Sequence, residues 1–201
     1  MYFEDEPRKG DWVQVFCGTA MWPMDPRPDE INIIDIANSL SKQCRFTGHC
    51  LDFYSVGEHS VRVSVAIENA LAPNVLRDEL SWSSSCLASL CGLLHDASEF
   101  VLSDISRPVK PYLSNYVQIE EDVMEAVAGK FGLPWPMPAI VKRMDNTLLA
   151  TEARDLMVKP PMPWAPLPDP LPEKIKPWSH RRACKKFLRR YEFLVQGREH
   201  A

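Results

Sequence analysis

The sequence predicts an all-α fold, a helical bundle with an irregular N-terminal arm and a proline-rich C-terminal strap. Three observations support this class. Apolar residues recur at helical spacing in several separate stretches from residue 29 onward. One of these stretches is apolar on nearly every side, as a helix in the centre of a bundle is. A run dense in proline near the C-terminus can be neither regular helix nor central strand.

Bulk composition indicates one compact domain. The chain has 201 residues, of which 45% are hydrophobic and 25% charged, values typical of soluble globular proteins. The formal net charge of −4 excludes a global basic field for DNA or RNA. We expect three parts within this domain, namely an arm (1–28), a core (29–157), and a strap with a final helix packed on the core (158–201).

Cysteine usage and the N-terminal segment predict a cytoplasmic protein, in the host cytoplasm if the source is a virus. None of the six cysteines forms a CxxC pair, so we expect reduced thiols. The N-terminal MYFEDEPRKGDW is charged and lacks the apolar region of a signal peptide. No run approaches the ~18 apolar residues of a membrane span, so no membrane partner is expected.

The first part of the chain is expected to be irregular before it becomes helical. Residues 1–28 show little periodicity, with a short strand pair near Trp12–Phe16 and Ala20–Trp22. Asp29–Leu40 has helical apolar spacing, and Asp29 can cap this helix. Cys44–Tyr54 reads as a loop.

Three helices are then predicted. Ser55–Leu71 resumes helical spacing, with Pro73 beyond its end. Leu80–Phe100 contains the nearly unbroken apolar stretch LASLCGLL, which suits the centre of the bundle. Tyr116–Phe131 is amphipathic and stops at Gly132, a typical helix C-cap.

The C-terminal third contains two helices separated by the strap. Pro138–Met157 begins with proline near its first turn. Lys159–Pro172 is the proline-dense segment, read as an extended strap across the surface. Ser179–Val195 is amphipathic, and its basic run 181–190 alternates with apolar positions. That run is therefore interpreted as a solvated face, with nucleic-acid binding as the alternative.

A candidate metal site begins with His95-Asp96 at the end of the most apolar helix. Ionisable residues there are costly to bury unless they are paired or bound to a metal. His59 lies at the start of another helix and Asp145 inside a third. Two imidazoles and two carboxylates make an open site for a divalent transition metal. For Asp145 the alternative is an ion pair with a neighbouring cation such as Lys142.

Two further carboxylates follow the His-Asp pair. Glu99 comes four residues after His95, so it shares that face if the helix continues. A metal lowers the pKa of bound water and polarises phosphorus. Glu99 is placed to orient or deprotonate that water, and Asp104 to position the nucleophile or protonate the leaving oxygen. The alternative for Glu99 is to accept a hydrogen bond from a ligand histidine.

These motifs resemble the HD-domain metal-dependent phosphohydrolase superfamily over roughly Asp29–Met157. The segments CRFTGHCLDFYSVGEHSVRVS and HDASEFVLSDISRPVK are similar to the branch containing 5′-deoxynucleotidases and phage dATP triphosphohydrolases. The resemblance implies an all-α bundle. It also implies metal ligands at His59, His95, Asp96 and Asp145, and catalytic roles for Glu99 and Asp104.

The predicted substrate-binding residues are Arg45, Phe46, Lys110 and Lys142. The deoxynucleotidases carry Arg-Trp where this chain has Arg45-Phe46, which keeps an apolar ring able to flank a base or sugar. A metal and three cations suit several phosphate charges, which favours a triphosphate over a monophosphate. The alternatives are a solvated role for Lys110 and a core role for Phe46.

Together, these observations predict an enzyme that hydrolyses dATP to deoxyadenosine and triphosphate. A 5′-deoxynucleotidase acting on monophosphates is the second reading, and a non-catalytic nucleotide-sensing module is the third. The ligand set admits Zn, Co, Mn, Fe or Ni, with additional Mg accompanying the nucleotide phosphates as an open alternative. The expected partners are the deoxynucleotide and further copies of the chain in a homo-oligomer.

Overall fold

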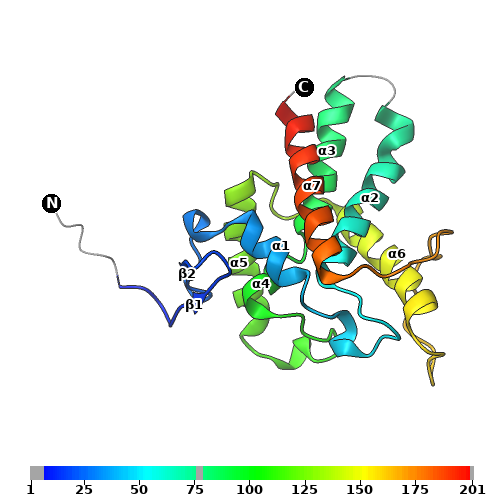
Figure 1. Ribbon diagram of the computed structural model, residues 1–201, viewed down its shortest axis with the longest axis horizontal. Coiled ribbons are helices and arrows are strands. Elements are labelled where there is room, and N and C mark those ends of the chain that lie inside the picture. Colours follow the sequence, from blue (N-terminus) through cyan, green and yellow to red (C-terminus); the bar gives the residue numbers. More distant parts are fainter. Residues whose placement is uncertain (1–6, 76–78, 200–201) are drawn as a thin grey trace.

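The computed structural model describes residues 7–75 and 79–199, and these residues are mostly helical, which confirms the all-α prediction. Three long helices lie side by side and a fourth packs across them (Figure 1). The side-by-side helices are α2 (Val56–Val75), α3 (Glu79–Leu94) and α7 (His180–Glu199), and the crossing helix is α6 (Ala139–Leu156).

Helix α5, which is as long as α3, and several short elements complete the fold. Helix α1 packs against α7 and α4, while α5 contacts the 3-10 turns η1 and η3. The bounds are α1 (Ile33–Leu40), α4 (Glu99–Leu102), α5 (Tyr116–Phe131), η1 (Pro28–Glu30), η2 (Arg45–Gly48) and η3 (Lys110–Tyr112). The predicted strand pair of the arm is present as β1 (Val13–Gln14) and β2 (Ala20–Met21), paired antiparallel.

The first two helices differ from prediction at one end each. Asp29 does not cap α1, because it lies in η1 and the side chain of Asn32 accepts the hydrogen bond from the Ile34 amide at 2.9 Å. Helix α2 continues past the predicted end at Leu71 and reaches Val75, so Pro73 lies within it.

The predicted helix Leu80–Phe100 is broken into two. Helix α3 ends at Leu94, and a tight turn follows in which the Ala97 amide donates to the Leu94 carbonyl at 3.0 Å. The Ser98 amide donates to the Met124 sulfur at 3.2 Å, so it does not continue the helix. The break places the His-Asp pair in a turn rather than on a helix face.

The remaining elements match the sequence closely. Helix α5 has its predicted bounds and ends at Gly132, which adopts the left-handed conformation with φ 61°. The strap 159–172 forms neither helix nor strand. Helix α7 buries Ala183, Phe187 and Leu194, so its apolar face belongs to the core. Most of its basic run is exposed, but Arg190 turns inward and pairs with Glu68 at 2.7 Å.

The apolar stretch that runs from α3 through α4 is long and apolar enough to be a candidate membrane span, which we did not predict from the sequence. Residues Ser83–Leu102 have the length and hydropathy required, but 67% of this window is buried inside the protein. A buried apolar helix is what the core of a bundle requires.

Candidate metal centre

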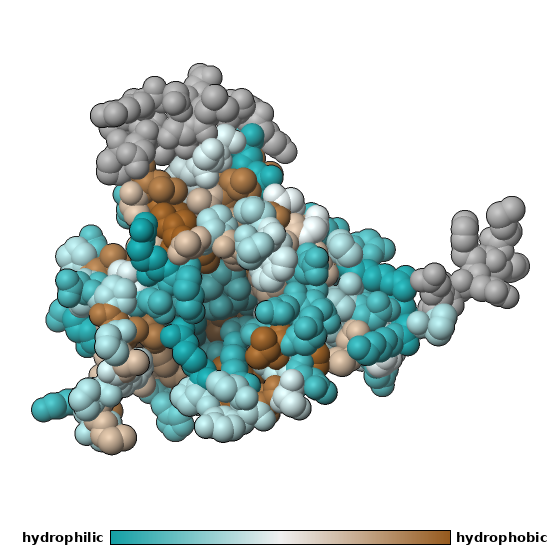
Figure 2. Space-filling view, turned by 180° about the vertical axis from the view of Figure 1, so that it is seen from behind, coloured by the Kyte–Doolittle hydropathy of each residue, from teal (hydrophilic) through white to brown (hydrophobic). Residues whose placement is uncertain are grey.

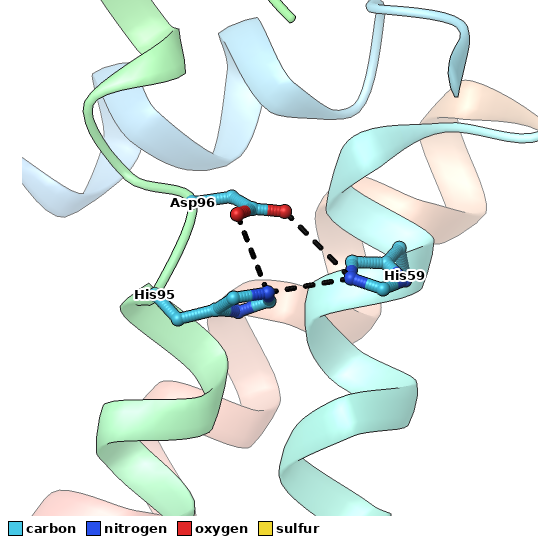
Figure 3. Close-up of side chains that lie close together, drawn as sticks. All are labelled: His59, His95 and Asp96. Atoms are coloured by element: carbon cyan, nitrogen blue, oxygen red, sulfur yellow. Dashed lines mark hydrogen bonds and ion pairs between the residues drawn. The ribbon is translucent and has the colours of Figure 1, made fainter. Parts of the chain in front are cut away.

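Four polar side chains from three parts of the fold converge at one point. His59 comes from the first turns of α2, and His95 and Asp96 come from the turn after α3, where all three point toward one another (Figure 3). Asp145 reaches the same point from the middle of α6. The sequence named these four as ligands, and the structure brings them together.

The distances suit a single divalent ion. The two histidine Nε2 atoms are 3.3 Å apart, and Asp145 Oδ1 lies 3.4 Å from His59 Nε2 and 3.9 Å from His95 Nε2. Asp96 contributes Oδ1 at 3.3 Å from His95 Nε2. Ligand atoms ~2.0–2.2 Å from a shared ion lie ~3.0–3.5 Å from one another. His59, His95 and Asp96 could therefore hold a metal ion, with Asp145 at its edge.

Each imidazole is oriented by a hydrogen bond from its Nδ1 atom, on the side of the ring away from the metal site. His59 Nδ1 lies 2.6 Å from Glu152 Oε1, and His95 Nδ1 lies 2.9 Å from the Gly92 carbonyl oxygen. A carboxylate and a carbonyl can only accept, so each Nδ1 carries the hydrogen and each Nε2 presents its lone pair forward. Two lone pairs facing each other at 3.3 Å require a cation or a proton between them.

A proton takes that position when no metal is bound. Burial and Arg45 would lower the pKa of His59, but Glu152 and Asp145 raise it to about 9. Burial lowers the pKa of His95, so it stays neutral. The pKa of Asp145 is well below its usual range because the two histidines and Lys142 outweigh the cost of burial. The site is thus a strongly negative pocket that takes up positive charge.

Glu152 is the residue that sequence reasoning missed. It is fully buried on α6 and also accepts a hydrogen bond from the Tyr54 hydroxyl at 2.8 Å. Its spacing of seven residues from Asp145 puts both on one face of α6, a signal that was available in the sequence. Arg45 Nη2 lies 3.3 Å from Glu152 Oε2, so this carboxylate links η2, which carries Arg45 and Phe46, to the metal site.

Arg45 is buried within the site rather than extended toward a substrate. Its guanidinium also lies 3.4 Å from Asp96 Oδ2. Burial alone would lower the pKa of Arg45, but Glu152 and Asp96 raise it, so the cation is permanent. Arg45 therefore offsets part of the negative charge of the ligand set. It also lines the adjoining cavity, and its contact with a substrate stays a prediction.

The predicted catalytic carboxylates line a cavity of about 1030 Å³ that also reaches His95, Asp96 and Asp145. One face of the molecule is hollowed near its centre, with hydrophilic surface inside and hydrophobic patches at the edge (Figure 2). Gln43 holds the Glu99 and Asp104 segments together. Its amide donates to the Glu99 carbonyl at 2.8 Å and accepts from the Asp104 amide at 3.1 Å.

Both catalytic candidates bind protons more tightly than usual. Burial, together with Asp96 and Asp104, raises the pKa of Glu99 to about 10. Burial also raises the pKa of Asp104, against the effect of Arg45. One oxygen of Glu99, Oε2, is buried without a hydrogen-bond partner among the described residues. An unsatisfied buried carboxyl facing a cavity is costly and is typical of a functional site.

Cations gather on one wall of the cavity. Lys142 Nζ and Arg107 Nη2 lie 2.9 Å and 3.5 Å from the same oxygen of Asp145, and both side chains are largely exposed. The ion pair between Lys142 and Asp145 is the alternative that the sequence left open, and Arg107 was not predicted. Lys110 also lines the cavity and forms an ion pair at 2.7 Å with Glu120, another residue of the cavity wall.

Phe46 lines the same cavity from a strained loop. Phe46 and Thr47 both have positive φ, at 56° and 54°, which residues with a Cβ rarely adopt. The Phe46 ring centroid is 6.5 Å from that of Trp164 on the strap. Phe46 is half-buried and lies outside the buried core cluster, so the core role considered for it is not what the structure shows.

Replacing Glu152 by glutamine is expected to weaken metal binding by about 10–100-fold, because the His59 ring loses its charged acceptor. Titration of chelated protein with Mn²⁺ measures this, and Glu68→Gln on the outer part of α2 is the matched control. An unchanged affinity in Glu152→Gln would show that Glu152 does not orient the ligand.

Metal affinity is expected to rise with pH. The pKa of His59 is raised to about 9, so below that pH a metal must displace its proton. The affinity should therefore fall up to about tenfold for each unit of pH decrease between roughly pH 8.5 and 6.5. Calorimetry in buffers of different ionisation enthalpy counts the released proton. A pH-independent affinity would contradict a metal at His59 Nε2.

No family model matches this chain. It is 36% identical over 145 residues to the uncharacterized protein YfdR of Escherichia coli, covering 72% of each chain. An uncharacterized protein of Rhodobacter capsulatus is also 36% identical, over 149 residues that cover 73% of this chain and 71% of the relative. The chain therefore belongs to the protein family that includes YfdR of Escherichia coli.

Proposed function

We propose that this protein is a divalent-metal phosphohydrolase of the HD-domain type that acts on deoxynucleotides. Its preferred substrate is dATP, hydrolysed to deoxyadenosine and triphosphate. One observation carries the proposal: the lone pairs of His59 Nε2 and His95 Nε2 face each other at 3.3 Å beside two carboxylates, at the end of a cavity with cationic walls.

The ligand set supports a transition metal. A divalent ion (Zn, Co, Mn, Fe or Ni) held by two imidazoles and two carboxylates would lower the pKa of a bound water and polarise a phosphoryl group. His59 and His95 would bind through Nε2, and Asp96 and Asp145 through carboxylate oxygens. Glu152 would keep the His59 ring in its binding tautomer.

Glu99 and Asp104 supply proton transfer in this proposal. The oxygen of a water molecule bonds to the α-phosphorus, and the bond from that phosphorus to the 5′ oxygen of the nucleoside breaks. One carboxyl takes the proton of the attacking water, and the other gives a proton to the 5′ oxygen. Both carboxyls line the cavity. A carboxyl with a raised pKa holds a proton near neutral pH and suits the donor to the 5′ oxygen, whereas the carboxyl that takes the proton of water must be ionised when the water attacks.

The choice of a triphosphate as substrate rests on the size of the cavity and on the positive charges in its wall. The cavity of about 1030 Å³ is large enough for a whole nucleotide. Arg107 and Lys142 stand beside Asp145, and Lys110 lies farther along the wall. Three cations beyond the metal suit a chain of phosphates better than a single one. Additional Mg²⁺ would accompany the phosphates that these cations do not neutralise.

Product analysis tests the proposal. Purified protein with each divalent ion is offered dATP, dGTP, dAMP and dCMP, and the products are separated. We expect deoxyadenosine and intact triphosphate from dATP. Inorganic phosphate from dAMP with dATP intact would identify a 5′-deoxynucleotidase instead. Saturable nucleotide binding without turnover under any metal would identify a nucleotide-sensing module.

A further inference from the structure

The proline-rich strap is fixed to the same helix that carries Asp145. It leaves α6 directly, and its far end returns to that helix, where the Leu171 amide donates to Thr151 Oγ1 at 2.9 Å. Arg154 donates to the Leu171 carbonyl at 2.7 Å and to the Glu173 carbonyl at 3.0 Å. The strap is thus held at both ends, and its middle forms part of the cavity wall.

Trp164 lies in this middle section, between Pro163 and Pro166. Proline restricts the backbone on either side, so the indole is held in place at low entropic cost. Trp164 is 40% exposed although it lines the cavity. Its ring is tilted 58° from that of Phe46. The two rings therefore make adjoining walls of one corner rather than a sandwich.

We propose that Trp164 is a base-binding residue, on whose indole the nucleobase stacks with Phe46 against the edge of the base. This inference rests on the proposed function. The cavity has a polar end with the metal ligands, Arg107 and Lys142, and an aromatic corner at the strap. A nucleotide has the same polarity, with charged phosphates at one end and a flat apolar ring at the other. An aromatic face is the usual platform for such a ring.

Binding measurements in the Glu99→Gln background separate this inference from turnover. Trp164→Ala should raise the Kd for dATP about tenfold and leave the Kd for 2-deoxyribose 5-triphosphate, which has no base, unchanged. Trp164→Phe should restore most of the affinity, and Trp12→Ala, in the exposed arm, should have no effect.

Two results would overturn this inference without contradicting the proposed function. One is an equal change in Kd for both ligands, and the other is a larger effect of Trp135→Ala, which removes a different aromatic of the cavity wall. Absence of nucleotide binding by the parent protein would instead contradict the proposed function together with this inference.

A second, independent observation concerns two thiols that bracket the strained loop. The sulfur atoms of Cys44 and Cys50 are 3.6 Å apart, and both side chains are half-buried. The five residues between them include Arg45 and Phe46. Positive φ at Phe46, Thr47 and Gly48 makes the turn tight enough to bring the two sulfurs together.

We infer that Cys44 and Cys50 form a reversible disulfide under peroxide. One thiol loses its proton, and the thiolate attacks hydrogen peroxide to give a sulfenic acid and hydroxide, which takes up that proton to become water. The second thiol then displaces the hydroxyl of the sulfenic acid as another water, so two thiols are oxidised and one peroxide is reduced. A bond of ~2.05 Å must draw the sulfurs together from 3.6 Å, and it would close the loop whose Arg45 lies 3.4 Å from Asp96.

Mass spectrometry tests this directly on the whole protein. Brief peroxide treatment should lower the intact mass by about 2 Da, link the peptides of Cys44 and Cys50, and reverse with dithiothreitol. Cys50→Ser should abolish the link, and Cys17→Ser, at the exposed cysteine, should not. Turnover should fall several-fold on oxidation of the parent and recover on reduction. Sulfinic acid at either cysteine without the link would overturn the inference.

Discussion

His95→Ala is expected to empty the metal site and to lower kcat/KM for dATP by at least about a thousandfold. The metal contributes several kcal/mol to the stabilisation of phosphoryl transfer, and each ~1.4 kcal/mol is a factor of ten. His95 supplies one of the two facing Nε2 atoms, so its loss leaves only His59 and two carboxylates. Metal content by elemental analysis and steady-state kinetics measure the two effects.

The matched control is His180→Ala, at the exposed start of α7, which should retain both metal and activity. Thermal unfolding of the chelated proteins separates a lost ligand from a lost fold. A cooperative unfolding transition in chelated His95→Ala would show that the fold survives the substitution, so that lost metal and activity report the lost ligand. Full activity in His95→Ala would exclude His95 as a ligand.

Glu99→Gln is expected to abolish turnover and at the same time to stabilise the protein. Glutamine cannot exchange a proton with water or with the 5′ oxygen, so kcat should fall by about 10²–10⁴-fold. The carboxyl of Glu99 has its pKa raised from 4.5 to about 10, so the folded protein must retain a proton that the unfolded chain loses.

The sign of the stability effect follows from that pKa. Between about pH 4.5 and 10 the folded state binds one proton more than the unfolded chain. Glu99 therefore lowers the free energy of unfolding by an amount that grows as pH rises. At about pH 8, which is about 3.5 units above 4.5, the chelated Glu99→Gln protein should gain up to about 5 kcal/mol, or about 10–20 °C in Tm, and the gain should fall to about 1 kcal/mol near pH 5. Glu125→Gln, on the exposed face of α5, is the control. A Tm gain that is independent of pH would contradict the assigned pKa.

The helices were predictable because each carries its own local signal. Tyr116–Phe131 was bounded correctly by amphipathic spacing and the glycine after it. The break after Leu94 was not predictable, because a contact distant in sequence, the Ser98 amide with the Met124 sulfur, holds the turn. The capping of α1 by Asn32 instead of Asp29 was a choice between two capable residues that lie close together.

The candidate site was predictable in its inner part only. His59, His95, Asp96 and Asp145 meet as expected, although the role of each as a ligand stays a prediction. The residues that support them carry no motif. Glu152 and Gln43 act through hydrogen bonds to partners 93 and 56 residues away. The spacing of Glu152 from Asp145 places both on one face of α6, but which residue each supporting side chain pairs with is visible only once the chain has folded.

Stoichiometric reactivation measures whether one divalent ion, bound at the His59, His95, Asp96 and Asp145 site, is required for hydrolysis. Chelated protein is titrated with Mn²⁺ or Co²⁺ while hydrolysis of dATP is followed. We expect no turnover at the start, a linear rise in the rate of hydrolysis with added metal, and a plateau beyond about one equivalent of metal, because the site has a single set of ligands. Full turnover in the chelated protein would contradict this expectation. So would metal binding at one equivalent without hydrolysis of any deoxynucleotide.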